Sequence, residues 1–266
     1  MNKDERLKKF SSIIDAGVTL GNKMVDSGYS PADMNVLFEK WAGEQDAGFW
    51  NWIDLTKNPE HKPDMTKNRI ITGVVYFLGN SGDWCPLLNH FAKNKITKEY
   101  RLVVPVIIYP GQNSGKESHY CCMSFDFKPE TDTVDIVLLE QHAMLDKSEK
   151  GYVEKLDYSD VIDFNLNNFI NYCKRILNYT NVNVLKNKKP ISRRQRVCGV
   201  VASEMARRLL LTENPSNLIN SPAVLYDDDI DKLHERNQEI VKVSVLKKAS
   251  KNIQEKTNIN AVEVQR

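Results

Sequence analysis

Apolar side chains recur every three or four residues in five parts of the chain, and this spacing predicts amphipathic helices. The helices are expected over about residues 4–25, 30–41, 158–177, 198–211 and 227–241. The second begins at Ser30 and Pro31, which suit an N-cap and the first helical position. Three aspartates open the last helix, as the helix dipole favours, and its pattern can continue to Lys251.

Apolar runs between these helices have the character of strands. Strands are expected over about residues 102–109, 119–127, 134–140 and 181–185. A polar turn joins the second run to the third, which is the pattern of a hairpin. Pro105 lies inside the first run and indicates an edge strand or a bulge. Residues 69–78 are strongly apolar and fit either a helix or a strand. The chain is therefore expected to be α+β, with a small mixed β-sheet flanked by helices.

Composition narrows the classes of protein to which the chain can belong. The 266 residues carry 37 Lys and Arg against 35 Asp and Glu, so the net charge of +2 indicates no nucleic-acid partner. The five cysteines have neither disulfide-like nor zinc-site spacing, which indicates a reducing compartment and no metal site. No apolar run has the length of a transmembrane segment, and residues 1–10 lack the apolar core of a secretory signal. We expect a protein that works in a cytosol or leaves the cell without a cleaved signal.

Three residues stand in the settings that cysteine acyl-transfer chemistry needs. His119 opens the first strand of the predicted hairpin and Glu140 ends the second, so the two side chains can meet. Cys198 lies in the first turn of a predicted helix, after an arginine-rich stretch. Free N–H groups at a helix start and neighbouring arginine charges both lower the pKa of a thiol. The three residues are therefore candidates for nucleophile, base and orienting acid.

Other assignments compete with this triad. A free cysteine is more often an inert core residue than a nucleophile. Core or loop positions suit the other four cysteines, Cys85, Cys121, Cys122 and Cys173. Asp126 and Asp135 are competing carboxylates, although Asp126 lies on the same strand as the histidine. The oxyanion hole needs the backbone N–H of the nucleophile and a second donor, for which Gln195 is the nearest side-chain candidate.

The order of histidine, acidic residue and cysteine resembles that in the clan of ubiquitin-like-protein proteases, as does a Cys-Gly pair at a helix start. Within this clan the chain is most similar to the YopJ/HopZ family, secreted bacterial effectors that acetylate Ser, Thr and Lys of host proteins. Three stretches carry this narrower resemblance, Pro86-Leu-Leu-Asn89, Val137-Leu-Leu-Glu140 and Leu233-His-Glu-Arg-Asn-Gln238. The resemblance covers about residues 35–248.

Some positions depart from the family pattern. His119 stands about two residues earlier relative to Asp126, which a bulge in its strand would absorb. The family commonly has its oxyanion glutamine about six residues before the cysteine, where this chain has Ser192 and where Gln195 lies closer. These departures put the assignment of the oxyanion donor in question and leave the assignment of the triad unchanged.

The resemblance implies a division of the chain and a reaction. A ubiquitin-like-protease-like catalytic core is expected over residues 69–212, between helical regulatory segments over 1–68 and 213–251, with a frayed tail over 252–266. Acetyl-CoA would acetylate Cys198, and a host protein, such as a kinase or another signalling protein, would accept the acetyl group. Such an effector leaves the bacterium by a route that needs no signal peptide and acts in the host cytoplasm.

The resemblance also implies an activator, inositol hexakisphosphate, held by basic side chains that suit phosphates. The residues assigned to it or to the phosphates of acetyl-CoA are Arg193, Arg194, His234, Arg236, Lys247, Lys248 and Lys251. A solvated helix face is the alternative for the C-terminal members of this set.

Two rival functions remain open. A deubiquitinase or ubiquitin-like-protein protease would use the same triad and let water resolve the acyl-enzyme. In a binding module without catalysis, Cys198 would be a packed helix residue.

Overall fold

The computed structural model describes residues 29–51, 64, 66–78, 97–109, 117–142, 157–220 and 224–263. The helix predicted over residues 4–25, the stretch 86–89 and Cys85 lie outside the described residues. The helices are α2 (Pro31–Glu44), the 3-10 turn η3 (Pro129–Thr131), α4 (Ser159–Arg175), α5 (Cys198–Leu211), α6 (Asn217–Asn220) and α7 (Asp227–Glu263). The strands are β1 (Gly48–Trp50), β2 (Arg69–Thr72), β3 (Val75–Leu78), β4 (Tyr100–Tyr109), β5 (His119–Lys128), β6 (Thr133–Leu139) and β7 (Asn181–Lys186).

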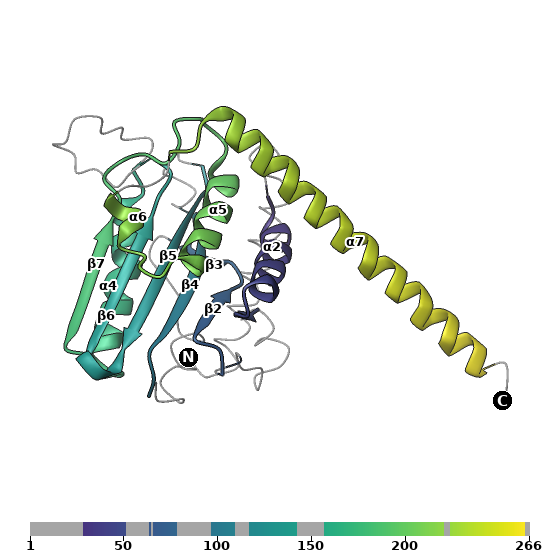
Figure 1. Ribbon diagram of the computed structural model, residues 1–266, viewed down its shortest axis with the longest axis horizontal. Helices are drawn as coiled ribbons and strands as arrows, with labels where there is room; N and C mark the ends of the chain where they lie inside the picture. The colour runs from purple at the N-terminus through teal and green to yellow at the C-terminus, as the bar shows by residue number, and fades with distance from the viewer. Residues whose placement is uncertain are drawn as a thin grey trace.

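The strands form one mixed seven-stranded sheet. Its order is β1-β2-β4-β5-β6-β7, and β3 pairs with the same side of β4 as β2 does. The pairs β4–β5 and β5–β6 are antiparallel, whereas the outer pairs are parallel. In Figure 1, α2 and α5 lie in front of the sheet and α4 lies behind it. The described chain is therefore α+β, with a mixed sheet flanked by helices, and the predicted fold class is confirmed.

The apolar run 69–78 forms two short strands rather than one element. The break between β2 and β3 falls at Gly73 and Val74, where α2 comes close to the sheet. The backbone N–H of Val74 donates to Asn35 Oδ1 over 3.0 Å. A Cβ on Gly73 would lie 3.1 Å from the same oxygen, so the close approach of Asn35 favours glycine there.

Pro105 lies in a central strand, so the predicted edge position is wrong. Pairing of β4 with β2 ends at Val103, and pairing with β3 begins at Val106. Pro105 falls in the gap between the two short strands. A proline can be accommodated there because β4 has no described neighbour on that side at this point of the strand.

Arg101 of β4 fixes the C-terminal end of α5. Its guanidinium donates to the carbonyl oxygens of Leu209 at 3.1 Å and Glu213 at 3.0 Å, and to that of Thr212. It also forms a bidentate pair with Asp126 of β5, at 2.7 and 2.9 Å. A cation suits the unpaired carbonyl groups at a helix end. Because Asp126 stands near the end of β5, α5 runs along β5 in the same direction, and the two elements begin at the same edge of the sheet.

Helix α2 begins where the sequence predicted, at Ser30 and Pro31. Ser30 is its N-cap, and a capping box joins the side chains and backbone N–H groups of Ser30 and Asp33. Pro31 occupies the first helical turn.

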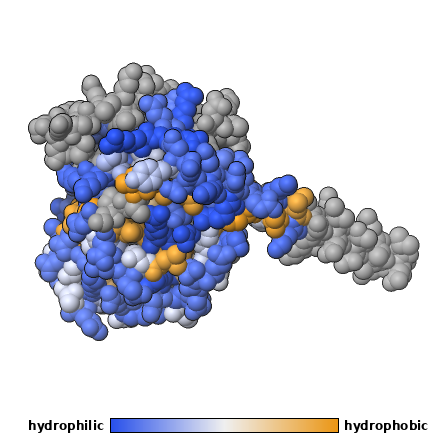
Figure 2. Space-filling model, turned by 45° about the horizontal axis from the view of Figure 1, so that its top comes forward, coloured by the Kyte–Doolittle hydropathy of each residue, from blue (hydrophilic) through white to orange (hydrophobic). Residues whose placement is uncertain are grey.

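Helix α7 is longer than predicted, because it continues beyond Lys251 to Glu263 and includes most of the segment expected to fray. Its first part packs against α2 and α5, and the rest extends away from the body (Figure 1). Val243 and Leu246 on this helix are exposed, and Figure 2 shows an apolar patch where α7 leaves the body. The helices in the described part of the chain include none with the length and apolar character of a membrane span.

Candidate active site

The three residues predicted to form a triad lie together at one edge of the sheet. His119 is the first residue of β5, Glu140 follows the last residue of β6, and Cys198 is the first residue of α5. His119 Nε2 lies 2.5 Å from Glu140 Oε1. All three residues are buried, with 5%, 2% and 7% of their surfaces exposed. The hairpin and the parallel course of β5 and α5 together bring three sequence-distant residues into one site.

Backbone groups and one asparagine hold Glu140 in place. Its second oxygen, Oε2, accepts the backbone N–H of His142 at 2.6 Å. The side chain of Asn187, just after β7, accepts the Glu140 N–H and donates to the Glu140 carbonyl, each over 2.8 Å. The carboxylate therefore presents one oxygen to His119 while the other is already satisfied.

Stacking by Tyr158 and the contact with Glu140 orient the ring of His119. Tyr158 stacks on it with a centroid distance of 4.7 Å and an interplanar angle of 9°. The Tyr158 hydroxyl donates to the Glu117 carbonyl oxygen over 3.0 Å, which fixes the phenol ring. Because Nε2 faces Glu140, Nδ1 is the ring nitrogen left for Cys198, and the two side chains are hydrogen bonded.

The electrostatics of the pair favour its ionised form. Burial acts to raise the pKa of Cys198, but the hydrogen bond and charge of His119 and the backbone N–H of Tyr120 lower it below the usual thiol value. Burial acts to lower the pKa of His119, but Glu140 and Cys198 raise it to about 10. These opposite shifts favour a thiolate beside an imidazolium.

The other described cysteines have the opposite shift. Burial raises the pKa of Cys121 and Cys122 above the usual range, and raises the pKa of Cys173 to about 12. All three are buried in the core, as expected from their apolar settings. Cys198 is the one described cysteine whose surroundings favour the reactive thiolate.

The loop that carries Cys198 is tied to the residue after Glu140. The carbonyl of Gln141 accepts the N–H groups of Ile191 at 2.8 Å and Ser192 at 3.3 Å, and its side-chain amide donates to the Arg194 carbonyl over 2.5 Å. Arg196 then adopts a φ of 59°, a left-handed conformation that is unfavourable for an arginine. The turn at Arg196 leads into α5, so the loop geometry sets the position of the thiol.

The competing carboxylates are engaged elsewhere. Asp126 forms the bidentate pair with Arg101, and Asp135 pairs with Lys128 at 2.6 Å and accepts from Asn183 at 2.8 Å. Both lie far along the hairpin from His119, opposite each other in the strand register. Glu140 is therefore the carboxylate in contact with the histidine.

Gln195, the predicted oxyanion donor, lies on the same loop, and its side chain is exposed to solvent. Gln195 is exposed in the turn before α5, and within the described part of the chain no hydrogen bond ties its side chain to the triad. Ser192, at the family's usual position, is buried, and its hydroxyl accepts the Arg194 N–H over 3.1 Å. The backbone N–H groups at the start of α5 have no partner within the helix, and the backbone N–H of Tyr120 is hydrogen bonded to the thiol. The role of Gln195 stays a prediction.

The basic residues predicted to bind anions fall into separate groups. Arg193 and Arg194 line a pocket beside the loop that leads to Cys198, and Arg194 pairs with Asp231 over 2.6 Å. Lys247 is exposed on α7, and the side chains of Lys248 and Lys251 lie outside the described part of the structure.

His234 and Arg236 serve the packing of α7 instead. His234 Nδ1 lies 2.9 Å from the Tyr29 hydroxyl, and Arg236 contacts Glu204 at 3.4 Å and lies over the Trp41 ring. Arg236 and Lys247 are eleven positions apart on one helix, or about 16 Å along its axis. The members of this set whose side chains are described do not form a single anion site, and anion binding by the set stays a prediction.

Sequence reasoning missed four residues that support the site, Gln141, His142, Tyr158 and Asn187. Gln141 and His142 follow Glu140 directly, and Asn187 follows a predicted strand. Their places next to predicted elements were visible in the sequence. The contact of Asn187 depends on the parallel pairing of β6 with β7, and that of Tyr158 on the placement of α4 beside β5, which no local pattern reveals.

Comparison with known proteins identifies a similar fold. No family model matches the chain, and no curated protein matches it. Among solved structures, the Legionella pneumophila effector protein RavZ matches with a TM-score of 0.52 and 11% identity, over 82% of this chain and 65% of that chain. RavZ in complex with human LC3B matches with a TM-score of 0.45 and 12% identity, over 79% and 60% of the two chains.

The central domain of an uncharacterized Legionella pneumophila protein, Lpg1148, matches with a TM-score of 0.40 and 16% identity, over 66% and 89% of the two chains. This chain thus spans just under two thirds of the RavZ chain that matches with the TM-score of 0.52. The YopJ/HopZ family does not appear among these matches, so that narrower assignment remains a prediction. The shared feature is the fold of a bacterial effector, RavZ.

Proposed function

We propose that the protein is a bacterial effector with cysteine-protease activity toward a host protein. The observation that carries this proposal is the buried contact of 2.5 Å between His119 and Glu140, with the Cys198 thiol hydrogen bonded to the same imidazole at a helix start. A thiolate, a proton donor and an orienting acid are the parts that cysteine acyl transfer requires. The fold shared with the effector RavZ supports the effector role.

The geometry suggests the order of steps. The Cys198 thiolate attacks the carbonyl carbon of the scissile amide, and the electron pair of the C=O bond moves to oxygen. The imidazolium of His119 gives its proton to the leaving amine as the C–N bond breaks, which leaves a thioester. His119 then takes a proton from water, whose oxygen attacks the thioester, and the carboxylic product leaves as the thiolate and imidazolium return. Glu140 accepts the hydrogen bond of the ring and stabilises the imidazolium throughout.

The oxyanion formed in each attack needs hydrogen-bond donors. The backbone N–H of Cys198 lies at the start of α5, where the N–H groups have no partner within the helix. Gln195 is the predicted second donor.

An acetyltransferase of the YopJ type is the second candidate. It would form the same thioester from acetyl-CoA and pass the acetyl group to Ser, Thr or Lys of a host protein. Arg193 favours it, because this exposed cation stands five residues before Cys198, where the phosphates of coenzyme A could bind. The scattered positions of His234, Arg236 and Lys247 offer no joint support for an inositol hexakisphosphate site.

Two parallel reactions separate these functions. Purified protein is incubated with ubiquitin and ubiquitin-like modifiers that carry a C-terminal thiol-reactive group, and with LC3B because RavZ was crystallised with it. In the second reaction, radiolabelled acetyl-CoA is added with and without inositol hexakisphosphate. We expect covalent capture of a modifier at Cys198 and no stable acetyl label.

The variants Cys198→Ala and Cys173→Ala make a matched pair of controls, since both remove one buried thiol. Capture is expected to disappear in the first and persist in the second. Acetylation of Cys198 from acetyl-CoA without capture of any modifier would favour the acetyltransferase. Equal labelling of Cys198→Ala and the unaltered protein in both reactions would contradict both functions.

A further inference from the structure

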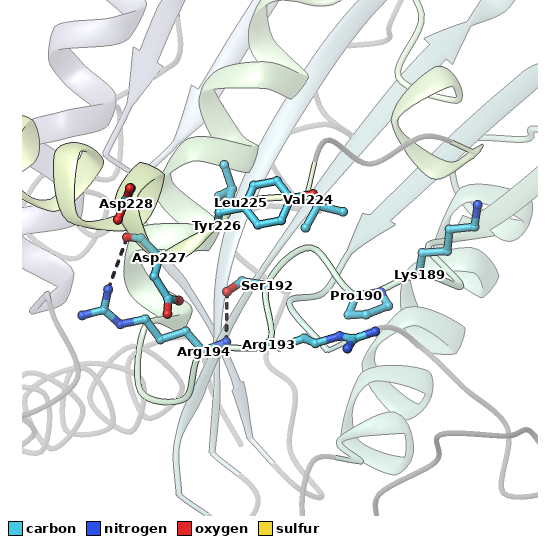
Figure 3. A pocket seen from close by; sticks show the side chains of 10 residues that line it. All are labelled: Lys189, Pro190, Ser192, Arg193, Arg194, Val224, Leu225, Tyr226, Asp227 and Asp228. Atoms are coloured by element: carbon cyan, nitrogen blue, oxygen red, sulfur yellow. Dashed lines mark hydrogen bonds between the residues drawn. The ribbon is translucent and has the colours of Figure 1, made fainter.

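The loop that delivers Cys198 also forms one wall of a pocket on the protein surface. Lys189, Pro190, Ser192 and Arg193 contribute from this loop, and residues 224–228, which lead into the first turn of α7, contribute the facing wall (Figure 3). The pocket has a volume of about 710 Å³. Sites that hold a small ligand or a few side chains commonly have volumes in the range of roughly 300–1,000 Å³.

The two walls are joined by the backbone. The N–H of Leu225 donates to the Ile191 carbonyl over 2.7 Å, and the N–H of Ile191 donates to the Gln141 carbonyl over 2.8 Å. Gln141 follows Glu140, so the pocket is connected to the triad by two hydrogen bonds and one peptide bond. The loop that leads to Cys198 is therefore shared between the pocket wall and the triad.

One wall of the pocket is apolar and exposed to solvent. Val224 and Tyr226 are 49% and 72% exposed, although both are large side chains with apolar surface. Exposed aromatic and aliphatic side chains that gather at one place commonly mark a site for a protein partner. Aromatic residues such as Tyr226 are frequent anchors in such sites.

The charges are distributed unevenly around this wall. At one end, Arg194 is neutralised by its pair with Asp231 at 2.6 Å, close to the aspartates that open α7. Lys189 and Arg193 lie on the other side, and both are exposed (Figure 3). No ion pair engages these two cations among the described residues. The free cationic end suits a carboxylate of a ligand.

We propose that this pocket binds an acidic–apolar segment of the substrate polypeptide, next to the bond that Cys198 attacks. The apolar side chain of the segment packs on Val224 and Tyr226, and its acidic side chain pairs with Lys189 and Arg193. The proposal rests on the protease function proposed above, and it names the substrate class that the site selects. A small polyphosphate would use the two cations but would leave the apolar wall unused.

Binding is measured with the full chain carrying Cys198→Ala, so that the result does not depend on turnover. The probe is a fluorescein-labelled nine-residue peptide of alternating Glu and Leu, observed by fluorescence anisotropy. One comparison peptide has Lys in place of Glu, and another has Ser in place of Leu. We expect the first peptide to bind about tenfold more tightly than either comparison peptide, and less tightly as salt increases.

Matched variants locate the binding. Lys189→Glu combined with Arg193→Glu, and separately Tyr226→Ala, are each expected to weaken binding about tenfold or more. Lys174→Glu and Ile176→Ala change an exposed lysine and an exposed isoleucine at the end of α4, and both are expected to bind as the parent does. Circular dichroism of each variant reports whether it folds.

Several outcomes would overturn the proposal. They are equal binding of the three peptides, no binding at low salt, and equal loss of binding in the α4 variants. Binding of coenzyme A or inositol hexakisphosphate that depends on Lys189 and Arg193 but not on Tyr226, without peptide binding, would assign the pocket to a small anion. Reaction of Cys198 with iodoacetamide in the unaltered protein reports on the triad separately, so failure of peptide binding is distinguishable from failure of the proposed function.

Discussion

Replacement of Glu140 by Gln tests the electrostatic basis of the site. The amide keeps the shape of the side chain but removes the charge that lies 2.5 Å from His119 Nε2. Both groups are buried, so water cannot replace the lost charge. The pKa of His119 is the quantity that this substitution is expected to change most.

The expected size follows from that pKa. Burial acts against the imidazolium, yet Glu140 and Cys198 raise the pKa of His119 from 6.5 to about 10. This difference corresponds to about 5 kcal/mol in favour of the charged ring. Glu140 is the largest of the causes that raise the pKa. If about 4 kcal/mol of the effect depends on the carboxylate, kcat/KM falls about 10³-fold in Glu140→Gln.

The pH dependence has a defined sign. His119 has a raised pKa, so its imidazolium persists from low pH until the pH rises through about 10. Cys198 has a lowered pKa, so its thiolate persists above that lowered value and is lost as the pH falls through it. In Glu140→Gln the imidazolium loses its proton at lower pH, and the thiolate loses its partner.

The assay is the rate of Cys198 alkylation by iodoacetamide as a function of pH, with Cys198→Ala to subtract the other thiols. The midpoint is expected to lie below that of an ordinary thiol in the unaltered protein and to move upward in Glu140→Gln. Asp163→Asn removes a carboxylate from a partly exposed ion pair with Lys186 and is expected to change neither quantity. An unchanged midpoint, with turnover within threefold of the unaltered protein, would refute the reasoning.

Three further substitutions test the surroundings of the site. Tyr158→Ala removes the ring stacked on His119. It is expected to lower kcat about three- to tenfold, since a stacked pair of rings contributes about 0.5–1.5 kcal/mol. Tyr158→Phe keeps the ring and should retain most of the rate. Asn187→Ala removes two hydrogen bonds to the backbone of Glu140, so the free energy of unfolding in urea should fall by about 2 kcal/mol and turnover should fall with it. The same loss of stability with full turnover would argue against a positioning role. Arg101→Met leaves Asp126, whose side chain is 13% exposed, without its partner and should lower the free energy of unfolding by about 3 kcal/mol. A melting temperature unchanged from the parent would contradict this account.

The sequence by itself determined the local elements and the identity of the three residues that meet. Helical spacing with Ser30 and Pro31 defines the start of α2, and alternation with a polar turn defines the β5–β6 hairpin. These are local signals, because caps, turns and periodicity involve residues close together in the chain. They were enough to place His119 and Glu140 on adjacent strand ends and Cys198 at a helix start.

Contacts between distant segments were decided by the tertiary structure alone. Pro105 indicated an edge strand, but two short strands share one side of β4 and leave a gap for it. Likewise, the sequence predicted that the basic residues on α7 form one anion site. In the structure, His234 and Arg236 instead pack the helix against the body of the protein. In both cases the sequence indicated which surroundings the residue favours. It did not indicate which distant segment of the chain provides them.

The supporting contacts of the site depend on the same distinction. Asn187 reaches Glu140 because β7 pairs in parallel with β6, and Tyr158 covers His119 because the start of α4 lies beside β5. Chain segments of several tens of residues separate these partners, so no short-range periodicity connects them. The sequence therefore determined which chemical groups were present and at which element ends they stood. The packing of α5 along β5 and of β7 beside β6 decided that these groups form one buried site whose surroundings favour the thiolate and the imidazolium. Burial and charge pairing exist only between elements that touch.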